Sequence, residues 1–311
     1  MANPHAFDGK VRRKKTKQTG KQPEESAGRA ALPDGFPAQS PFEQDMNHQV
    51  VTVQTQHPCA YIVGEELDQG SRARQEDAAR CSSEAVYLEK GFMAVVSDGM
   101  GGMGDGDRFS EIAVREMVRH FETCPPMEDL CQELRECFKK AHDAAQPLVQ
   151  EGSQGGATVV AVLVRNGRCA FLSVGDSSIC LLRGGGLIKL NRVQNYGVML
   201  DESVAFGYLS QEYATDSAQR KTITDYLGSE SAIRCDVCPA PFELVKGDRI
   251  ALMTDGVTGT LSQSELERLI GEGSCIEAAQ NVISAVKQKN KPRQDNSSIM
   301  LIGYEDNPFL K

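Results

Sequence analysis

Short apolar runs bounded by an acidic residue recur along the chain. Three of them stop at an aspartate beside Gly or Ser: FMAVVSDG at Asp98, CAFLSVGDS at Asp176 and RIALMTDG at Asp255. In a fourth, QDNSSIMLIGY, the aspartate Asp295 comes first. Each run has the length, composition and flanking turn residues of a buried strand. We therefore predict four strands with a carboxylate at one end of each.

Other segments carry apolar residues at the three- and four-residue spacing of amphipathic helices. They are 107–123 with Ser110 as a candidate cap, 127–149, 262–270 with Ser262 or Ser264 as the cap, and 276–289. Two further strands are joined by Asn166-Gly167, which is typical of a two-residue hairpin turn. The order is strands, two helices, hairpin strands, two helices and a last strand. This order favours an α+β fold, with antiparallel sheets and segregated helices, over an alternating parallel fold.

Composition permits a large core and excludes little. The 311 residues are 40% hydrophobic and 25% charged, enough for one large domain or two ordinary ones. The net charge of -9 argues against nucleic acid as the main partner. No apolar stretch approaches the roughly 20 residues that span a bilayer, and the N-terminus lacks the apolar region of a signal peptide. We therefore expect a cytoplasmic protein.

The ten cysteines mostly fall inside apolar patterns, which favours reduced, buried thiols over a disulfide scaffold. Cys235 and Cys238 form a lone CxxC, for which a redox or metal role is the weaker alternative.

The first 50 residues differ from the rest. They carry a basic cluster followed by Pro, Gly, Ser and Ala, with almost no periodic apolar positions, so we predict a disordered basic tail at 1–50 and a folded domain at 51–311. The tail is interpreted as a solvated segment. An electrostatic arm for anionic lipid, nucleic acid or an acidic partner is the alternative, and the sequence does not choose between them.

The four strand-end aspartates indicate a metal site. If their strands share one core, the acids meet at one rim, where their repulsion is severe unless cations neutralise them. Carboxylate oxygens suit Mg, Mn or Ca, whereas the scattered histidines form no zinc-like spacing. Acid clusters around hard cations serve phosphate hydrolysis or transfer. Phosphoester hydrolysis is the leading hypothesis.

The glycines after Asp98 offer a competing motif. Gly99, Gly101 and Gly104 satisfy GxGxxG between a strand and a helix, as in a dinucleotide-binding turn. The charge of Asp98 would oppose a pyrophosphate, and two helices follow where a parallel strand should return. A nucleotide-binding fold is kept as a minor alternative. The acids Asp105 and Asp107 lack the spacing of a calcium loop and are interpreted as solvated acids at a helix start.

In their order along the chain, SRARQEDA, SDGMGG, GGATVVAV, VGDSS, MTDGV and QDNSSIML resemble the metal-dependent type 2C serine/threonine protein phosphatase family, in a bacterial-like form. The resemblance covers about residues 58 to 304. It implies a four-layer α-β-β-α sandwich of two mainly antiparallel sheets flanked by helices. It also implies two Mn²⁺ or Mg²⁺ ions in a cleft at one end of the sheets, with a third, weaker metal site.

The resemblance implies a role for each matching residue. Asp98 would bridge both metals, Gly99 would offer its carbonyl, Asp255 and Asp295 would complete one metal, and Glu76 would approach the other. Asp77 would orient coordinated water, Asp176 with Asp255 would bind the third metal, and Arg72 would bind the phosphate, with Arg74 as its rival. A carboxylate can bridge two ions, and the water between them is the nucleophile, so no covalent intermediate is needed.

Three departures from the family pattern stand out. Met100 occupies the place of a histidine suited to protonating the leaving oxygen. The family's Asp-Ser-Arg reads Asp176-Ser177-Ser178, and its later Asp-His pair is missing around Val193, Gln194 and Asn195. The last two put the third metal in doubt. Residues 191–228 correspond to the variable flap beside the cleft, where we expect substrate choice to be governed.

The sequence thus predicts hydrolysis of phosphoserine and phosphothreonine in proteins. The expected partners are phosphorylated targets of a serine/threonine kinase, and the expected oligomeric state is a monomer. The alternative is a catalytically silent relative that binds phosphoproteins or assembles partners through its tail.

Overall fold

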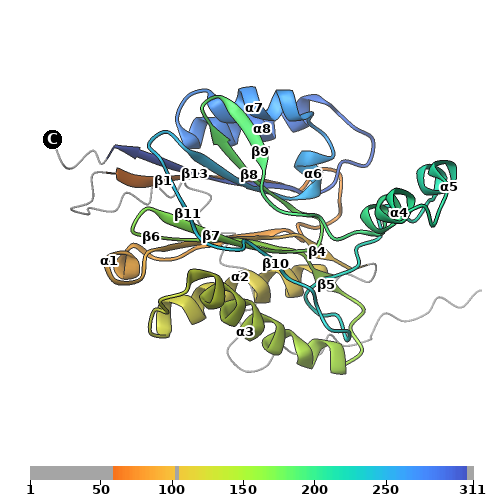
Figure 1. The fold of residues 1–311 in the computed structure, drawn as a ribbon, viewed down its shortest axis with the longest axis horizontal. Coiled ribbons are helices and arrows are strands. Elements are labelled where there is room, and N and C mark those ends of the chain that lie inside the picture. The colour runs from red at the N-terminus through yellow and green to blue at the C-terminus, as the bar shows by residue number, and fades with distance from the viewer. Residues whose placement is uncertain (1–58, 102–104, 307–311) are drawn as a thin grey trace, which may run out of the picture. The chain divides into compact units, whose positions relative to one another are not determined.

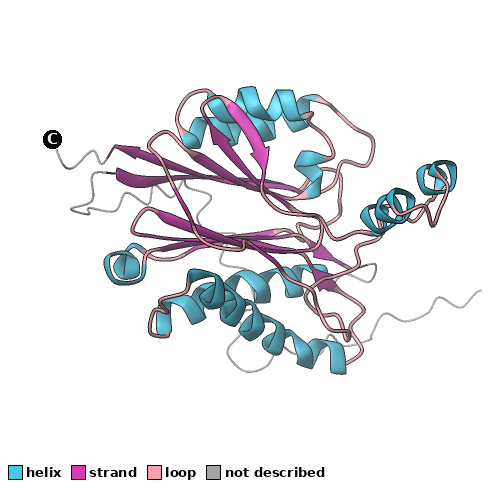
Figure 2. Cartoon of the chain, in the orientation of Figure 1, coloured by secondary structure: helices cyan, strands magenta, loops and turns pink. Residues whose placement is uncertain are grey.

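The computed structural model describes residues 59–101 and 105–306. The predicted tail at 1–50, the predicted domain start at 51 and Gly104 of the glycine motif all lie outside these residues. Within them, two antiparallel sheets face each other and helices cover their outer faces (Figures 1 and 2). This is the predicted α-β-β-α sandwich.

The first sheet, sheet A, has the strand order β1-β13-β12-β8-β9. Its strands are β1 (Cys59–Asp68), β13 (Ser297–Asp306), β12 (Arg249–Met253), β8 (Ser178–Arg183) and β9 (Gly186–Lys189). Every neighbouring pair is antiparallel, and Met253 of β12 lies opposite Ile299 of β13. Strand β13 therefore starts at the end of the sheet where β12 stops.

The second sheet, sheet B, has the order β10-β7-β6-β3-β2, with β11 also paired to β7. Its strands are β10 (Asp236–Val237), β7 (Arg168–Val174), β6 (Val159–Arg165), β3 (Phe92–Ser97), β2 (Ala78–Cys81) and β11 (Phe242–Glu243). Strands β4 (Gly99–Met100) and β5 (Gly156–Ala157) form a short pair of their own. The predicted hairpin joins β6 to β7, and Asn166 and Gly167 have φ values of 53° and 73°, as its tight turn requires.

Helices α2 (Gly106–Thr123) and α3 (Leu130–Gln150) pack on sheet B, and α7 (Gln263–Gly271) and α8 (Cys275–Gln288) pack on sheet A. The predicted helices at 107–123, 127–149, 262–270 and 276–289 are thus confirmed. The shorter helical elements are η2 (Glu84–Val86), α1 (Tyr87–Lys90), α4 (Tyr196–Ala205), α5 (Gln211–Asp216) and α6 (Asp255–Thr258).

The structure shows which of the predicted cap residues cap a helix. Ser262 forms a capping box with Glu265, so it, rather than Ser264, begins α7. The proposed cap at Ser110 is wrong, because α2 begins earlier, with Asp105 at its N-cap position. The Ser110 hydroxyl instead donates to the backbone oxygens of Glu76 and Asp107. It thereby ties the helix to the segment that precedes β2.

The nucleotide-binding alternative is also wrong. The short β4 and then helices α2 and α3 follow β3 along the chain. The next strand of sheet B in the sequence is β6, and it pairs with β3 antiparallel. A dinucleotide-binding unit needs a parallel strand there.

The structure holds the nine cysteines between Cys81 and Cys275 as free thiols. Cys238 of the CxxC pair lies beside Cys131 of α3, with 3.5 Å between their sulfur atoms, and both are buried. Among the described residues no helix is long and apolar enough to cross a membrane.

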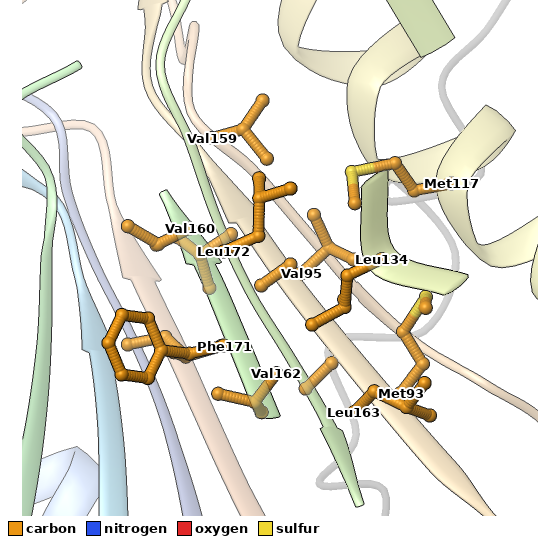
Figure 3. Close-up of a cluster of buried hydrophobic side chains, with 14 of the residues drawn as sticks. Met93, Val95, Met117, Leu134, Val159, Val160, Val162, Leu163, Phe171 and Leu172 are labelled. Carbon is orange, nitrogen blue, oxygen red and sulfur yellow. The ribbon is translucent and has the colours of Figure 1, made fainter. Parts of the chain in front are cut away.

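The strands of sheet B carry apolar residues on both faces because one face meets sheet A and the other meets α2 and α3. Figure 3 shows Met117 of α2 and Leu134 of α3 beside Met93, Val95 and Leu163 of the sheet. All five side chains have an exposed fraction of 0%. This two-sided packing explains why the strands read as continuous apolar runs rather than alternating ones.

We expect Leu134→Ala to lower the free energy of unfolding by about 2–5 kcal/mol, because it leaves a cavity between α3 and sheet B. The matched control is Leu88→Ala, whose side chain is 76% exposed and should change stability by less than about 0.5 kcal/mol. Denaturant titration followed by circular dichroism measures both. Equal effects of the two substitutions would contradict this description of the core.

Candidate metal centre

The predicted acids leave the two sheets at the same end. Asp98 follows β3, and Asp255 follows β12 as the first residue of α6. Asp295 stands two residues before β13, and Asp176 lies between β7 and β8. Glu76 and Asp77 precede β2, which is the neighbour of β3. Antiparallel pairing brings a strand end and the next strand's start together, so both sheets contribute acids to one rim.

Asp98 shows how closely the carboxylates are gathered. Burial, and then the negative charges of Asp77, Asp255, Asp176 and Asp295, raise the pKa of Asp98 well above its usual range. The pKa of Asp255 is raised in turn by burial and then by the negative charge of Asp295. Five chain segments therefore place their acids within one electrostatic site.

Asp77 is held from one side only. Its Oδ2 accepts hydrogen bonds from Thr254 Oγ1 at 3.0 Å and Ser298 Oγ at 2.7 Å, whereas its buried Oδ1 has no partner among the described residues. Burial is the main cause that raises the pKa of Asp77 to about 7. Within the described part of the chain, Asp176 likewise has a buried Oδ1 without a hydrogen-bond partner. A buried carboxylate oxygen without a partner is costly, so both atoms are suited to a ligand from outside the chain, such as a cation or a water.

Thr158 connects the turns that carry Asp98 and Asp176. The Asp98 N–H donates to Thr158 Oγ1 at 3.1 Å, and the Thr158 N–H donates to the backbone oxygen of Asp98 at 2.9 Å. Thr158 Oγ1 also lies 2.7 Å from Ser177 Oγ. Thr158 is fully buried, so this hydroxyl contact fixes the two acidic turns relative to each other.

Two glycines allow the backbone to pass close to the acids. A Cβ on Gly99 would lie 2.3 Å from the backbone oxygens of Glu76 and Gly106. A Cβ on Gly256, next to Asp255, would lie 1.9 Å from the backbone oxygen of Asn296. Any side chain at either place would push the neighbouring acid segments apart.

Asn296 is a positioning residue that sequence reasoning missed. Its Oδ1 accepts the N–H of Glu76 at 2.8 Å, and its Nδ2 donates to the backbone oxygens of Gln69 and Arg74. The buried amide thereby attaches the segment that holds Arg72 and Glu76 to the start of β13. Its place beside Asp295 was the only signal in the sequence.

Asp107 lies at the helix start, as interpreted, and the structure adds a neighbour that the sequence did not indicate. Burial and then the charge of Asp107 raise the pKa of Glu76, while Arg72 and Arg74 oppose that rise. Asp107 is half-buried in the first turn of α2 and adds a negative charge beside Glu76. The short distance in sequence from Asp98 to the helix was the signal for it.

Arg72 lies at the edge of the cluster, and its phosphate-binding role stays a prediction. Its Nη2 donates to Asp295 Oδ2 at 2.6 Å, and its side chain is 52% exposed. Arg74 is also exposed, and its charge reaches Glu76. The structure therefore brings both candidate arginines to the acid rim.

The donor set fits hard cations. Among the described residues, no three His, Cys, Asp or Glu side chains are grouped as the ligands of one ion. Mg²⁺ does not require such a group, because it keeps several waters and binds through one or two carboxylates. The oxygen-only acids, the two unpartnered carboxylate oxygens and the mutual repulsion at Asp98 all suit Mg²⁺ or Mn²⁺.

A helix-covered pair of antiparallel sheets with an acid cluster at one end defines a class of proteins in which hard cations act at the rim of an α-β-β-α sandwich. The chain belongs to the protein phosphatase 2C family, whose sequence pattern matches residues 69–294. The family predicted from the ordered motifs is thereby confirmed.

Bacterial phosphatases are among its relatives. Protein phosphatase PhpP of Streptococcus pneumoniae strain R6 is 27% identical over 224 residues, which are 69% of this chain and 86% of PhpP. Serine/threonine phosphatase stp of Listeria monocytogenes EGD-e is 24% identical over 218 residues, covering 68% of this chain and 83% of stp.

Solved structures share the fold. The Mycobacterium tuberculosis serine/threonine phosphatase PstP/Ppp superposes with a TM-score of 0.65 at 24% identity, over 79% of this chain and 99% of that one. The Streptococcus agalactiae serine/threonine phosphatase gives 0.67 at 22% identity, over 79% and 100%. A PstP catalytic domain in complex with two manganese ions gives 0.64 at 23% identity, over 80% and 100%. The predicted sandwich fold is confirmed.

We expect Asp98→Asn to stabilise the metal-free protein at pH 8. The folded state raises the pKa of Asp98, so it binds the proton more tightly than the unfolded chain, and the free energy of unfolding falls as pH rises through that window. Asparagine removes this penalty. The gain should exceed about 1 kcal/mol at pH 8, since one pKa unit corresponds to about 1.4 kcal/mol, and should shrink toward about pH 4.

Urea unfolding with chelator across this pH range measures the difference. Asp216→Asn, at an exposed acid of α5, is the matched control and should stay within about 0.5 kcal/mol of the wild type at every pH. A wild type more stable than Asp98→Asn at pH 8 would contradict the electrostatic description of the cluster.

Proposed function

We propose that the acid cluster is the active site of a metal-dependent phosphatase that hydrolyses phosphoserine and phosphothreonine in proteins. The observation that carries the proposal is the convergence on Asp98 of the charges of Asp77, Asp176, Asp255 and Asp295. A fold of this family concentrates the acids where cations would neutralise them. The proposal rests on this chain's own residues as well as on its relatives.

The proposed ligand roles follow the sequence prediction. Asp98 would bridge two ions, Asp255 and Asp295 would complete one of them, and Glu76 and the carbonyl of Gly99 would serve the other. Asp176 would join Asp255 at a third, weaker ion, which its unpartnered Oδ1 supports. Mn²⁺ or Mg²⁺ bound there lowers the pKa of water and draws charge from phosphoryl oxygens.

The chain's other residues orient the reactants. Arg72 presents a planar fork that can hold two phosphate oxygens and align the ester for in-line attack. Asp77 would accept a hydrogen bond from the attacking water through Oδ1, while Thr254 and Ser298 hold its other oxygen. Attack of water on phosphorus displaces the serine or threonine oxygen directly. Met100 carries no proton for that oxygen, so its side chain is no general acid.

The finer predictions about the protein's setting stand as part of this proposal. They are kinase-modified proteins as substrates, substrate choice by the flap at 191–228, a monomeric state, a cytoplasmic location and a solvated basic tail at 1–50.

Phosphate release from a phosphothreonine peptide tests the activity. We expect turnover with Mn²⁺ or Mg²⁺, none above background with chelator, and a loss of at least about 100-fold in Asp98→Asn, because the acid that bridges the ions is removed. Activity that survives both chelation and Asp98→Asn would refute the metal mechanism. No turnover by folded, Mn²⁺-loaded wild type on diverse phosphopeptides would instead favour the silent alternative.

Arg72→Ala should raise the Michaelis constant for phosphopeptide about 10-fold or more, since a charge-assisted hydrogen bond contributes about 1.5–3 kcal/mol. Arg74→Ala is the matched control on the same segment and should change it less. Steady-state kinetics on one peptide compares the two variants. If Arg74→Ala has the larger effect, the phosphate-binding role belongs to Arg74.

A further inference from the structure

Gln194 lies where the sequence departs from the family pattern, and the structure gives it a specific place. Its backbone N–H donates to the Gly175 oxygen at 2.8 Å, and its side-chain Oε1 accepts the Gly175 N–H at 2.7 Å. Gly175 directly precedes Asp176 and has a φ of 97°, in the left-handed region. Gln194 thus binds the turn that carries Asp176 through two hydrogen bonds, one from its backbone and one to its side chain.

The opposite side of this turn is already fixed. A Cβ on Gly175 would lie 2.7 Å from the side chain of Thr158, and Thr158 contacts Ser177 on the other side of Asp176. The buried Oδ1 of Asp176 has no hydrogen-bond partner among the residues that the structure describes. The turn therefore sets the direction of that oxygen, and the turn itself is held by Thr158 on one side and by Gln194 on the other.

Gln194 also belongs to the root of the flap. Its backbone oxygen accepts the N–H of Thr224 at 3.1 Å, and its Nε2 donates to the backbone oxygen of Arg234 at 2.5 Å. Arg234 is in turn paired with the buried Asp225 at 2.7 Å. One glutamine thereby joins the outgoing chain, the returning chain and the turn of Asp176.

The two chains at the root of the flap are paired directly beside Gln194. Asn195 forms a β-bridge with Ile223, and the N–H of Tyr196 donates to the Thr222 oxygen at 2.8 Å. Helices α4 and α5 follow and project from the end of the sandwich where α6 and β4 lie (Figure 1). A movement of the flap would reach Asp176 through Gln194.

We propose that Gln194 is a positioning residue that sets Asp176 for the weaker metal ion and couples the flap to that site. This inference rests on the proposed function, because it assumes that Asp176 is a metal ligand. Gln194 stands where the Asp-His pair of the family pattern is missing, and it binds the turn of Asp176 through one backbone and one side-chain hydrogen bond. Its proposed action on the metal site is through Asp176.

The test measures Mn²⁺ binding to the full chain by electron paramagnetic resonance, which counts free Mn²⁺ without any need for turnover. Gln194→Met keeps the side-chain length and removes both side-chain hydrogen bonds, and Gln194→Leu repeats the loss with a different shape. Gln211→Met, on exposed α5, is the matched control. Circular dichroism establishes that each variant is folded.

We expect both Gln194 variants to raise the dissociation constant of the weakest Mn²⁺ site about 10- to 100-fold, as loss of an outer partner of a metal ligand does, with the tighter sites unchanged. In an Asp176→Ala background, Gln194→Met should have no further effect, because the residue that it positions is gone. Gln211→Met should bind as the wild type does.

Several results would overturn the inference. They are superimposable binding curves for wild type and both Gln194 variants, equal weakening of every site, an undiminished effect in the Asp176→Ala background, or a wild type that binds no ion beyond the tighter two. Absence of phosphatase activity in the wild type would instead refute the proposed function, since the binding curves do not depend on turnover.

Discussion

The repulsion among carboxylates at one end of the sandwich is the constraint on which the other features depend. Burial opposes the ionised form of Asp98, and the neighbouring acids add to that opposition. A chain that keeps such a cluster must hold the acids in place against their mutual electrostatic repulsion. The hydroxyls of Thr158, Thr254 and Ser298, all buried, provide that restraint without adding charge.

The two sheets make the restraint effective because they are packed on both faces. Sheet B is held between sheet A and the helices α2 and α3, and sheet A between sheet B and the helices α7 and α8. Such a strand holds in place the backbone of an acid that directly follows or precedes it. The acids are therefore carried by packed strands, and the segment at 191–228 is attached beside them through Gln194 and Asn191.

Much of this arrangement could be predicted from the sequence because its signals are local. The apolar runs that end at Asp98 and Asp255, the Asn166-Gly167 turn and the four main helices all have short-range signatures. Glu76 and Asp77 carry no strand signal of their own and were reached only through the resemblance to the family. Their proximity to the other acids is now a structural observation, while their roles as ligand and water-orienting group remain proposals.

What could not be predicted depends on segments distant in sequence. Asn296 binds the backbone of Glu76, 220 residues away, and no local pattern encodes that contact. The effect of Asp107 on Glu76 was not predicted, because a helix start gives no sign of which neighbour its acid faces. Ser110 was misread because a hydroxyl near a helix start resembles a cap whether or not the helix begins there.

The pairing of β12 with β13 has a consequence for how such a chain can vary. The chain leaves sheet A at Asp255 and re-enters it after Asp295, at the same end of the sheet. The 39 residues between these two acids form one long connection that contains α7, α8 and most of α6. The turn between α7 and α8, at Glu272 and the positive-φ Gly273, is exposed. Chain length added there would not alter the register of the two strands. Arg249 of β12 donates to the backbone oxygens of Ile270 and Gly273, so the α7–α8 turn tolerates inserted sequence only where these two hydrogen bonds to the sheet are kept.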